Sequence, residues 1–203
     1  RIQLPAAAFK MDVRPLLKLV LNAFLGSSTG LVDMCVEHLP SAAEASKAAT
    51  TTAPPDSVLA RAIERCDAQG PLLIQIAKVY PTSDATEFRA FGRVLSGTVS
   101  CGQSVKVLGP TYTPEDEEDM AVETVSGVYV AEARYAVHAP GVPAGNWVLL
   151  SGIDATIAKS ATVCDTALPV ADTYVLRPIV HMTESVLKVA IEPLRPAELP
   201  KML

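Results

Sequence analysis

The stretch that decides the fold spans residues 92–109 and reads GRVLSGTVSCGQSVKVLG. Two runs rich in valine are separated by short segments that contain glycine, a pattern typical of consecutive β-strands joined by tight turns. Gly97 interrupts the first run, which predicts a bulge or a close approach of another backbone. Gly102 provides the backbone freedom that a tight hairpin requires. Val105 and Val107 alternate along the return strand, so we expect one of its faces to be buried.

Further strand-like segments lie on both sides of this hairpin. Each is rich in apolar residues and ends at a turn signal such as Pro-Gly or Ala-Gly. The expected strands cover residues 72–79, 88–99, 104–108, 121–130, 133–139, 146–151 and 160–164. Several short strands at regular spacing are typical of a mainly β domain, and we predict a closed antiparallel β-barrel. Because a hairpin of this kind carries no chemistry of its own, the pattern favours a binding or positioning role.

The segments outside the expected barrel show other patterns. Residues 10–39 follow helical spacing and predict two helices, with Pro15 in the opening turn of the first and Gly26 at its end. Residues 41–56 are rich in Ala, Ser, Thr and Pro, which predicts a loop or linker. One short helix is expected in residues 57–66. Residues 184–193 alternate again and predict a strand that opens another domain.

Composition places the chain among globular proteins, because 49% of its 203 residues are hydrophobic and 19% are charged. The four cysteines lie far apart and form no Cys-x-x-Cys pair, so we expect reduced thiols. The three histidines are equally scattered, and no zinc-ligand spacing occurs. The most apolar run, residues 13–25, is short and contains Arg14 and Lys18. We therefore predict no membrane-spanning segment and no membrane partner.

The net charge of −5 lies entirely in residues 71–165, which hold six basic and eleven acidic residues. Five of the acids form one run, which consists of Glu115, Asp116, Glu117, Glu118 and Asp119. We interpret this run as a solvated loop between strands. A docking loop for a basic protein and a guard that repels RNA are the alternatives. Phosphate binding needs clustered lysines and arginines, so the charge argues against a free-standing RNA-binding barrel.

Two motifs that bind nucleotides are absent from the sequence. The phosphate-cradling pattern Gly-x-x-x-x-Gly-Lys-Ser/Thr does not occur, nor does the guanine-reading Asn-Lys-x-Asp. One Asp-x-x-Gly occurs at residues 67–70, but it precedes a strand instead of following one, and we interpret it as a coincidence. We therefore predict no catalytic residue and no metal or cofactor site in this chain.

Three strand residues are candidates for an interface. Arg89 and Arg93 share one face of the expected strand 88–99, and they are either solvated or in contact with a neighbouring domain or an RNA backbone. The other face of this strand carries Phe88, Ala90, Gly92 and Val94. Trp147 follows a Gly-Asn turn, and it is either a core or interdomain packing residue or an interface anchor.

These residues together resemble the translational GTPases of the elongation factor 2 type. The resemblance is carried by the glycine and valine pattern of residues 92–109, by VPAGN at 142–146 and by GID at 152–154. This part looks like domain II, the β-barrel that follows the GTP-binding domain. The order of the motifs is that of the family, and the resemblance covers nearly the whole chain.

The flanking segments resemble the neighbouring domains of the same family. LVDMCVEHLPS at residues 31–41 looks like the closing helix of the GTP-binding domain, and residues 189–193 with 196–201 look like the start of domain III. We therefore expect an internal piece of a longer protein. The implied organisation is helices of the GTP-binding domain in 1–40, a linker with a short helix in 41–70, domain II in 71–165, and a connection with the first strand of an α+β domain III in 166–203.

A spliceosomal branch of the family, the elongation factor 2-like GTPases of the U-five small nuclear ribonucleoprotein, resembles the chain more closely. Three features favour it, namely VRPLLKLV at 13–20 with GLVDMCV at 30–36, YTPEDEED at 112–119, and PAGNWVL at 143–149. The alternative is a ribosomal translocase, in which we would expect a basic or mixed loop at the acidic run and no tryptophan at 147.

This resemblance implies a function for the whole protein. It would bind GTP with magnesium and act in the nucleus as a conformational switch during pre-mRNA splicing. Its domain II would be a non-catalytic arm that docks on its own GTP-binding domain and domain III. The large scaffold protein of the spliceosome core would be a further partner, with small nuclear RNA nearby. The resemblance assigns no catalytic residue to this chain.

Overall fold

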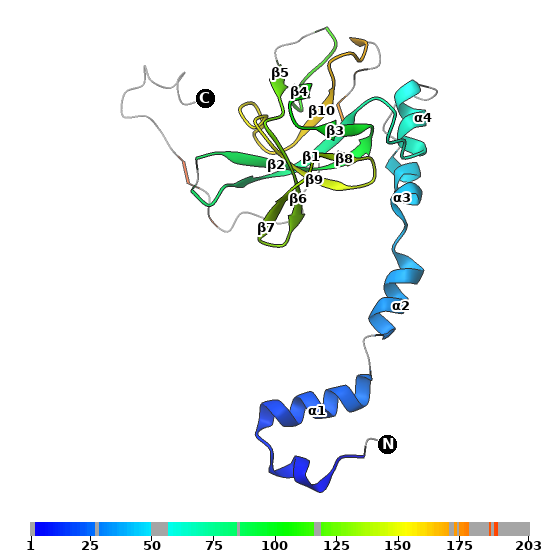
Figure 1. Cartoon of the computed structure of the whole chain (residues 1–203), viewed down its shortest axis with the longest axis vertical. Helices are drawn as coiled ribbons and strands as arrows, with labels where there is room; N and C mark the ends of the chain where they lie inside the picture. The colour runs from blue at the N-terminus through cyan, green and yellow to red at the C-terminus, as the bar shows by residue number, and fades with distance from the viewer. Residues whose placement is uncertain are drawn as a thin grey trace.

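The computed structural model describes residues 3–26, 29–49, 57–84, 86–115, 119–170, 173, 175–178, 187 and 189–190. Within these residues the helical segments come first, and they are η1 (Ala6–Lys10), α1 (Val13–Leu25), α2 (Thr29–His38), α3 (Ala42–Ala49) and α4 (Val58–Glu64). The strands follow as β1 (Leu73–Pro81), β2 (Phe88–Ser96), β3 (Thr98–Ser100), β4 (Ser104–Leu108), β5 (Met120–Thr124), β6 (Gly127–Glu132), β7 (Tyr135–His138), β8 (Gly141–Pro143), β9 (Trp147–Ser151) and β10 (Ala161–Asp165). Figure 1 shows α4 beside the strands and α1 and α2 apart from them.

The helices expected in residues 10–39 are confirmed as α1 and α2. Pro15 lies in the first turn of α1, where its missing N–H costs nothing. Gly26 ends the helix at a φ of +68°, a conformation that glycine adopts without strain. The short helix expected in 57–66 is also present as α4, and Ser57 caps it by accepting a 3.0 Å hydrogen bond from Ala60 N.

The expectation of a loop in residues 41–56 is wrong for the first part of this segment, which forms α3. Ser41 N and Ser41 Oγ both donate to Glu44 Oε2 at 2.8 Å, and Glu44 N donates back to Ser41 Oγ at 3.3 Å. This capping box satisfies backbone donors at the helix start, and the bonds from Ser41 hold the pKa of the Glu44 carboxyl below its usual value. The Ser-x-x-Glu signal was present in the sequence and outweighs the linker-like composition.

All strands pair in antiparallel fashion, as expected for this class. Eight form one sheet in the order β5-β4-β10-β1-β2-β9-β6-β7, and β3 pairs with β8 in a separate ribbon. Two expected strands are each divided in two. Gly97 separates β2 from β3, and residues 125–126 separate β5 from β6. The expected strand in 184–193 falls almost wholly outside the described residues.

The prediction of a closed barrel is wrong, because β5 and β7 are the two edges of the large sheet and do not pair with each other in the described part of the chain. A corner between β5 and β6 explains the difference. Val125 N donates to Gln103 O at 3.0 Å, which extends the pairing with β4, whereas Ser126 N donates to Ser151 O at 2.9 Å, beside β9. The backbone therefore runs from the edge strand β5 to β6, the neighbour of the other edge strand β7, whereas closure would require a ladder of hydrogen bonds between strands.

The main hydrophobic core lies against one face of the bent sheet. It contains Leu72, Ile74, Ile76, Ala90, Val94, Val99, Val105, Val107, Val125, Val128, Val142, Val148, Leu150, Ile153, Ile157, Ala161 and Val163. The burial of Val105 and Val107 confirms the expected inner face of β4. Phe88 was expected on the inner face of β2, but it is 46% exposed because it lies at the strand end, paired with Pro81 beyond the core.

Gly97 lies where the backbone crosses the start of β1. Its φ is +76°, and a Cβ at this position would lie 2.7 Å from Leu72 Cα and 2.9 Å from Gly70 O. Gly97 N donates to Asp67 O at 2.8 Å, and Gly97 O accepts from Ala144 N at 2.9 Å. The expected close approach of another backbone is therefore confirmed. The Asp-x-x-Gly of residues 67–70 forms the turn beneath this crossing, with Gln69 N donating to Asp67 Oδ1 at 2.9 Å.

A second hydrophobic cluster packs α4 onto the sheet. Leu59 and Ile63 of α4 belong to it together with sheet residues Leu73, Leu95, Leu108 and Cys164 and the later residues Leu168 and Leu176. Ile63 is fully buried and Leu59 is 1% exposed. The short helix before β1 is therefore packed as tightly as the strands are.

The four cysteines, Cys35, Cys66, Cys101 and Cys164, are all free thiols, as expected. Cys101 is exposed, whereas Cys164 is 2% exposed. Burial raises the pKa of the Cys164 thiol from 9.0 to about 11, although nearby Lys106 opposes the shift. Well below pH 9 the thiol is neutral in both the folded and the unfolded chain.

We expect a pH effect on stability from Cys164. Between about pH 9 and 11 the unfolded chain loses the thiol proton first, so the free energy of unfolding falls across this window, by roughly 2–3 kcal/mol in total from this group. Urea unfolding of the chain and of Cys164→Ala, compared across this pH range, measures the effect. Equal slopes in the two proteins would contradict it.

A candidate interaction groove between two hairpins

A row of aromatic side chains crosses the outer face of the sheet. Tyr80 of β1 meets the Phe91 ring of β2 edge to face, with ring centroids 5.8 Å apart. Phe91 stacks on Trp147 of β9 with centroids 4.9 Å apart and an interplanar angle of 8°. Because strand residues alternate between faces, Phe91 points away from the core that its neighbours Ala90 and Gly92 face. The row therefore forms a continuous aromatic surface over three adjacent strands.

Cations lie over rings beside this row. The Arg89 guanidinium is centred 4.4 Å from the Tyr129 ring, Lys78 Nζ lies 5.2 Å from the Tyr80 ring, and the Arg134 guanidinium lies 5.6 Å from the Tyr135 ring. The contact with the Tyr129 ring stabilises the charge of the Arg89 guanidinium and provides no carboxylate to accept from its N–H groups. Its Nε is buried and has no hydrogen-bond partner.

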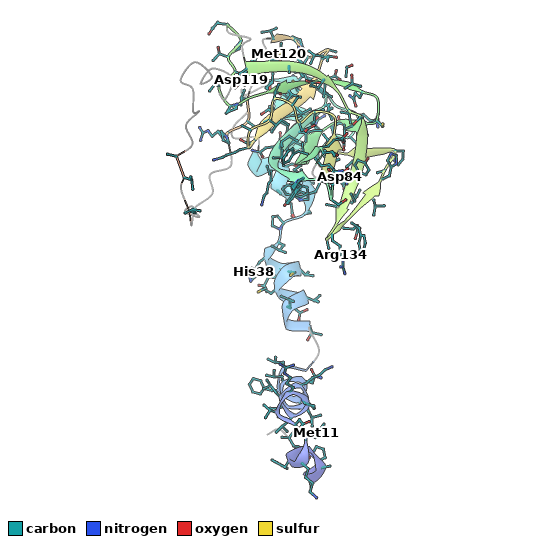
Figure 2. All side chains as sticks on the ribbon, turned by 90° about the vertical axis from the view of Figure 1, so that its left-hand side faces the viewer. Met11, His38, Asp84, Asp119, Met120 and Arg134 are labelled. Carbon is teal, nitrogen blue, oxygen red and sulfur yellow. The ribbon has the colours of Figure 1, made fainter. Side chains whose placement is uncertain are left out.

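Between the ends of two hairpins the surface is hollowed into a groove of about 500 Å³. One side is the end of β1 and the following turn, from Tyr80 to Ser83, and the other side is the β6–β7 hairpin, with Arg134 and Tyr135. Phe91 and Leu149, paired across β2 and β9, lie between them in the sheet order. Figure 2 shows Arg134 at the free end of its hairpin. A volume of this size is within the range of ligand sites.

The groove is positive within an acidic segment. Arg89 and Arg134 line it, and none of the described lining residues is acidic. Asp84 lies in the turn between β1 and β2, but its carboxylate accepts hydrogen bonds from Thr82 Oγ1 at 2.6 Å and Thr86 Oγ1 at 2.9 Å. These bonds lower the pKa of Asp84, so its charge is already satisfied locally. Among the described residues, no acid that lines the groove therefore neutralises its two arginines.

Two of the three interface candidates lie on this surface, and the third faces elsewhere. Arg89 lines the groove, and Trp147, 46% exposed, ends the aromatic row. Arg93 pairs with Trp147 across the strands but extends toward α3, where its Nη2 lies 3.5 Å from Ala42 O. The interface role of these three residues remains a prediction.

The acidic run is only partly the solvated loop that we expected. Glu115 is exposed, and Asp116, Glu117 and Glu118 lie outside the described residues. The expectation is wrong for Asp119, whose Oδ2 accepts hydrogen bonds from Thr111 N at 3.0 Å and from Thr111 Oγ1 at 2.5 Å. Asp119 O also accepts from Gly109 N at 2.9 Å. Asp119 therefore closes the loop between β4 and β5, near the strand start labelled Met120 in Figure 2.

We expect the two described acids of this run to differ in their effect on stability. Asp119→Ala removes a charged acceptor and should lower the free energy of unfolding by about 1–2 kcal/mol. Glu115→Ala should change it by less than about 0.5 kcal/mol, because Glu115 is exposed. Urea denaturation of both variants measures the difference. Equal stabilities would show that the Thr111 bonds do not hold the loop.

Sequence analysis missed most of the groove. Phe91 lies between Arg89 and Arg93 on the same face of one strand, so alternation could have placed it there. No pattern in the sequence indicated Tyr80 or Arg134 as its neighbours, because they lie on hairpins more than fifty residues apart. The pairing order of the strands brings them together.

Among the described residues, no group of three or more His, Cys, Asp and Glu side chains is placed to hold a metal ion. No single described helix is long and apolar enough to cross a membrane, although α1 and residues 29–47, bent by 52° at the break between them, meet the criteria of length and composition as a pair.

The strands from β2 to β10 match a known family. Residues 88–164, from the start of β2 to β10, match the family described as Elongation factor Tu domain 2. Residues 88–164 are therefore similar to a domain of the elongation-factor class, in agreement with the resemblance noted in the sequence.

Relatives extend the match over the full chain. The chain is 43% identical over 205 residues to the 109 kDa U5 small nuclear ribonucleoprotein component GFL of Arabidopsis thaliana, and equally to the 110 kDa component CLO of that plant. It is 44% identical over 208 residues to the pre-mRNA-splicing factor cwf10 of Schizosaccharomyces pombe. All three alignments cover 100% of this chain and 21% of the relative. The chain is therefore similar along its whole length to splicing components, and the predicted resemblance to the spliceosomal branch is confirmed.

Proposed function

We propose that this chain is the non-catalytic β module of a GTP-binding conformational switch that acts in pre-mRNA splicing in the nucleus. The observation that carries the proposal is the identity of 43–44% to splicing components along the entire chain, helices included. The match to an elongation-factor domain 2 supports a module that positions other parts of a larger protein. The three relatives described above are splicing components, which supports the splicing role over the ribosomal alternative.

The flanking segments would belong to the neighbouring domains of that larger protein. We assign residues 1–40 to the closing helices of the GTP-binding domain, 41–70 to a linker with packed α4, 71–165 to domain II and 166–203 to the start of domain III. The helix α1 supports the first assignment, because Val13, Leu17, Leu21 and Phe24 form an apolar stripe that is 43–79% exposed. A stripe at this spacing, not covered by the described residues, suits a helix that packs on another domain.

The partners of the module would be its own GTP-binding domain, domain III and the large scaffold protein of the spliceosome core, with small nuclear RNA nearby. The contact of Arg93 with Ala42 supports a mechanical link, because it connects β2 to the helices that precede the sheet. GTP and magnesium would bind outside this chain. The module would respond to the nucleotide through movements of the helices relative to the strands.

Two measurements test this proposal. We expect the tagged full-length protein to copurify with U5 small nuclear RNA from nuclear extract and to bind GTP in a calorimetric titration. We expect residues 1–203 alone, folded by circular dichroism, to bind no GTP. Copurification with ribosomal RNA instead would overturn the splicing role, and micromolar binding of GTP by the isolated chain would overturn the non-catalytic assignment.

A further inference from the structure

We propose that the groove between the β1–β2 turn and the β6–β7 hairpin binds a short peptide segment of a partner protein, in which a carboxylate side chain lies beside an apolar one. The proposal goes beyond the function above and does not depend on the GTPase assignment. It concerns the chemistry of the occupant, and three features of the groove support it.

The first feature is unsatisfied positive charge. Arg89 is half-buried, and its Nε has no hydrogen-bond partner although it is shielded from solvent. Within the described residues the contact recorded for its guanidinium is the Tyr129 ring at 4.4 Å, which cannot accept an in-plane N–H. A carboxylate in the plane of the guanidinium would accept two parallel hydrogen bonds, the geometry for which arginine is suited. Arg134, across the groove, adds a second positive charge.

The second feature is the apolar surface between the two arginines. Phe91 and Leu149 form it, with Tyr80 on one side and Tyr135 on the other. Tyr80 is 43% exposed and Tyr135 is 65% exposed, so both rings have uncovered area. Tyrosine and arginine at the centre of a concave surface are the residue types that contribute most to protein–protein binding. An apolar side chain of the partner would bury this surface while its carboxylate meets Arg89.

The third feature separates a peptide from a nucleic acid. Aromatic rings and arginines also bind single-stranded RNA, but such a site follows the phosphates with several cations. This groove offers two arginines, within a segment that carries the whole net charge of −5. The electrostatic field of this negative segment therefore repels a polyanion. A single carboxylate is repelled much less, and it is attracted locally by Arg89 and Arg134. The charge balance favours the peptide.

The test is a selection of random peptides displayed on phage against the immobilised 203-residue chain, followed by titration of the enriched peptides by fluorescence anisotropy. We expect the enriched peptides to share an Asp or Glu next to an apolar residue. Arg89→Gln should weaken their binding by about tenfold or more, because a charged hydrogen-bonded pair is lost. Phe91→Ala should weaken it by a similar factor, because the apolar contact is lost.

The matched control is Lys159→Gln, which removes one charge from an exposed residue that does not line the groove. It should leave affinity unchanged, and circular dichroism melting of all variants separates loss of binding from loss of folding. Replacing the shared acid of a selected peptide by its amide should reproduce the effect of Arg89→Gln. The proposal is overturned if no peptide is enriched, if the enriched peptides lack an acid, if Arg89→Gln binds them normally, or if a single-stranded oligouridine competes for the groove and binds more tightly.

Discussion

Gly97→Val should strongly destabilise the folded chain. The added Cβ would lie 2.7 Å from Leu72 Cα and 2.9 Å from both Gly70 O and Leu72 N, all of them backbone atoms that cannot turn aside. The φ of +76° adds strain, because β-branched residues rarely adopt it. Together these effects should cost about 4 kcal/mol or more, a large share of the stability of a typical domain. Circular dichroism and urea unfolding would show the loss.

Gly102→Val is the matched control for this prediction. Gly102 has a similar φ of +82°, but a Cβ there would meet no atom within 4 Å. Its cost should therefore be the strain of the left-handed backbone alone, about 1–2 kcal/mol. If the two variants were equally stable, the crossing of the backbone at Gly97 would not be as close as the structure shows.

Ile63→Ala should destabilise the chain by about 2–5 kcal/mol, although the residue lies outside the strands. Ile63 is fully buried between α4 and the sheet, in contact with the cluster that includes Leu73 and Leu108. Truncation would leave a cavity that neither the sheet nor the short helix can close. The midpoint of urea unfolding should fall, while the cooperativity of the transition remains.

Val58→Ala, on the same helix, distinguishes packing from helix propensity. Val58 is 58% exposed, and alanine favours the helix more than valine does, so the free energy of unfolding should change by less than about 0.5 kcal/mol. A small effect of Ile63→Ala would mean that α4 is not part of the cooperative unit. Residues 71–165 would then fold without it.

Local patterns predicted the local features correctly. Pro15 and Gly26 marked the first helix, and the alternation of Val105 and Val107 indicated the buried face of β4. The errors came where two local signals competed. Ala and Ser in residues 41–49 suggested a linker, yet the capping pair Ser41 and Glu44 forms a helix, because the hydrogen bonds of the cap outweigh composition.

Asp119 illustrates a different limit of the sequence. Within a run of five acids it has the same local signal as Glu115, yet one is exposed and the other closes a loop through Thr111. Only the partner eight residues away distinguishes them. The groove shows the same limit over a longer distance in the sequence. Arg89 and Arg134 line one groove only because β2, β9 and β6 are neighbours in the sheet.

The sequence by itself determined the class of the domain, the position of most strands and the need for glycine at Gly97, because alternation and backbone freedom are properties of neighbouring residues. The similarity to splicing components also comes from the sequence, because it rests on residue identity. The tertiary structure alone decided that the sheet stays open at β5 and β7, that α4 is packed onto it, and that Phe91 lies between two arginines in a groove. These features depend on the order in which distant strands pair, and that order is set by the packing of the whole core.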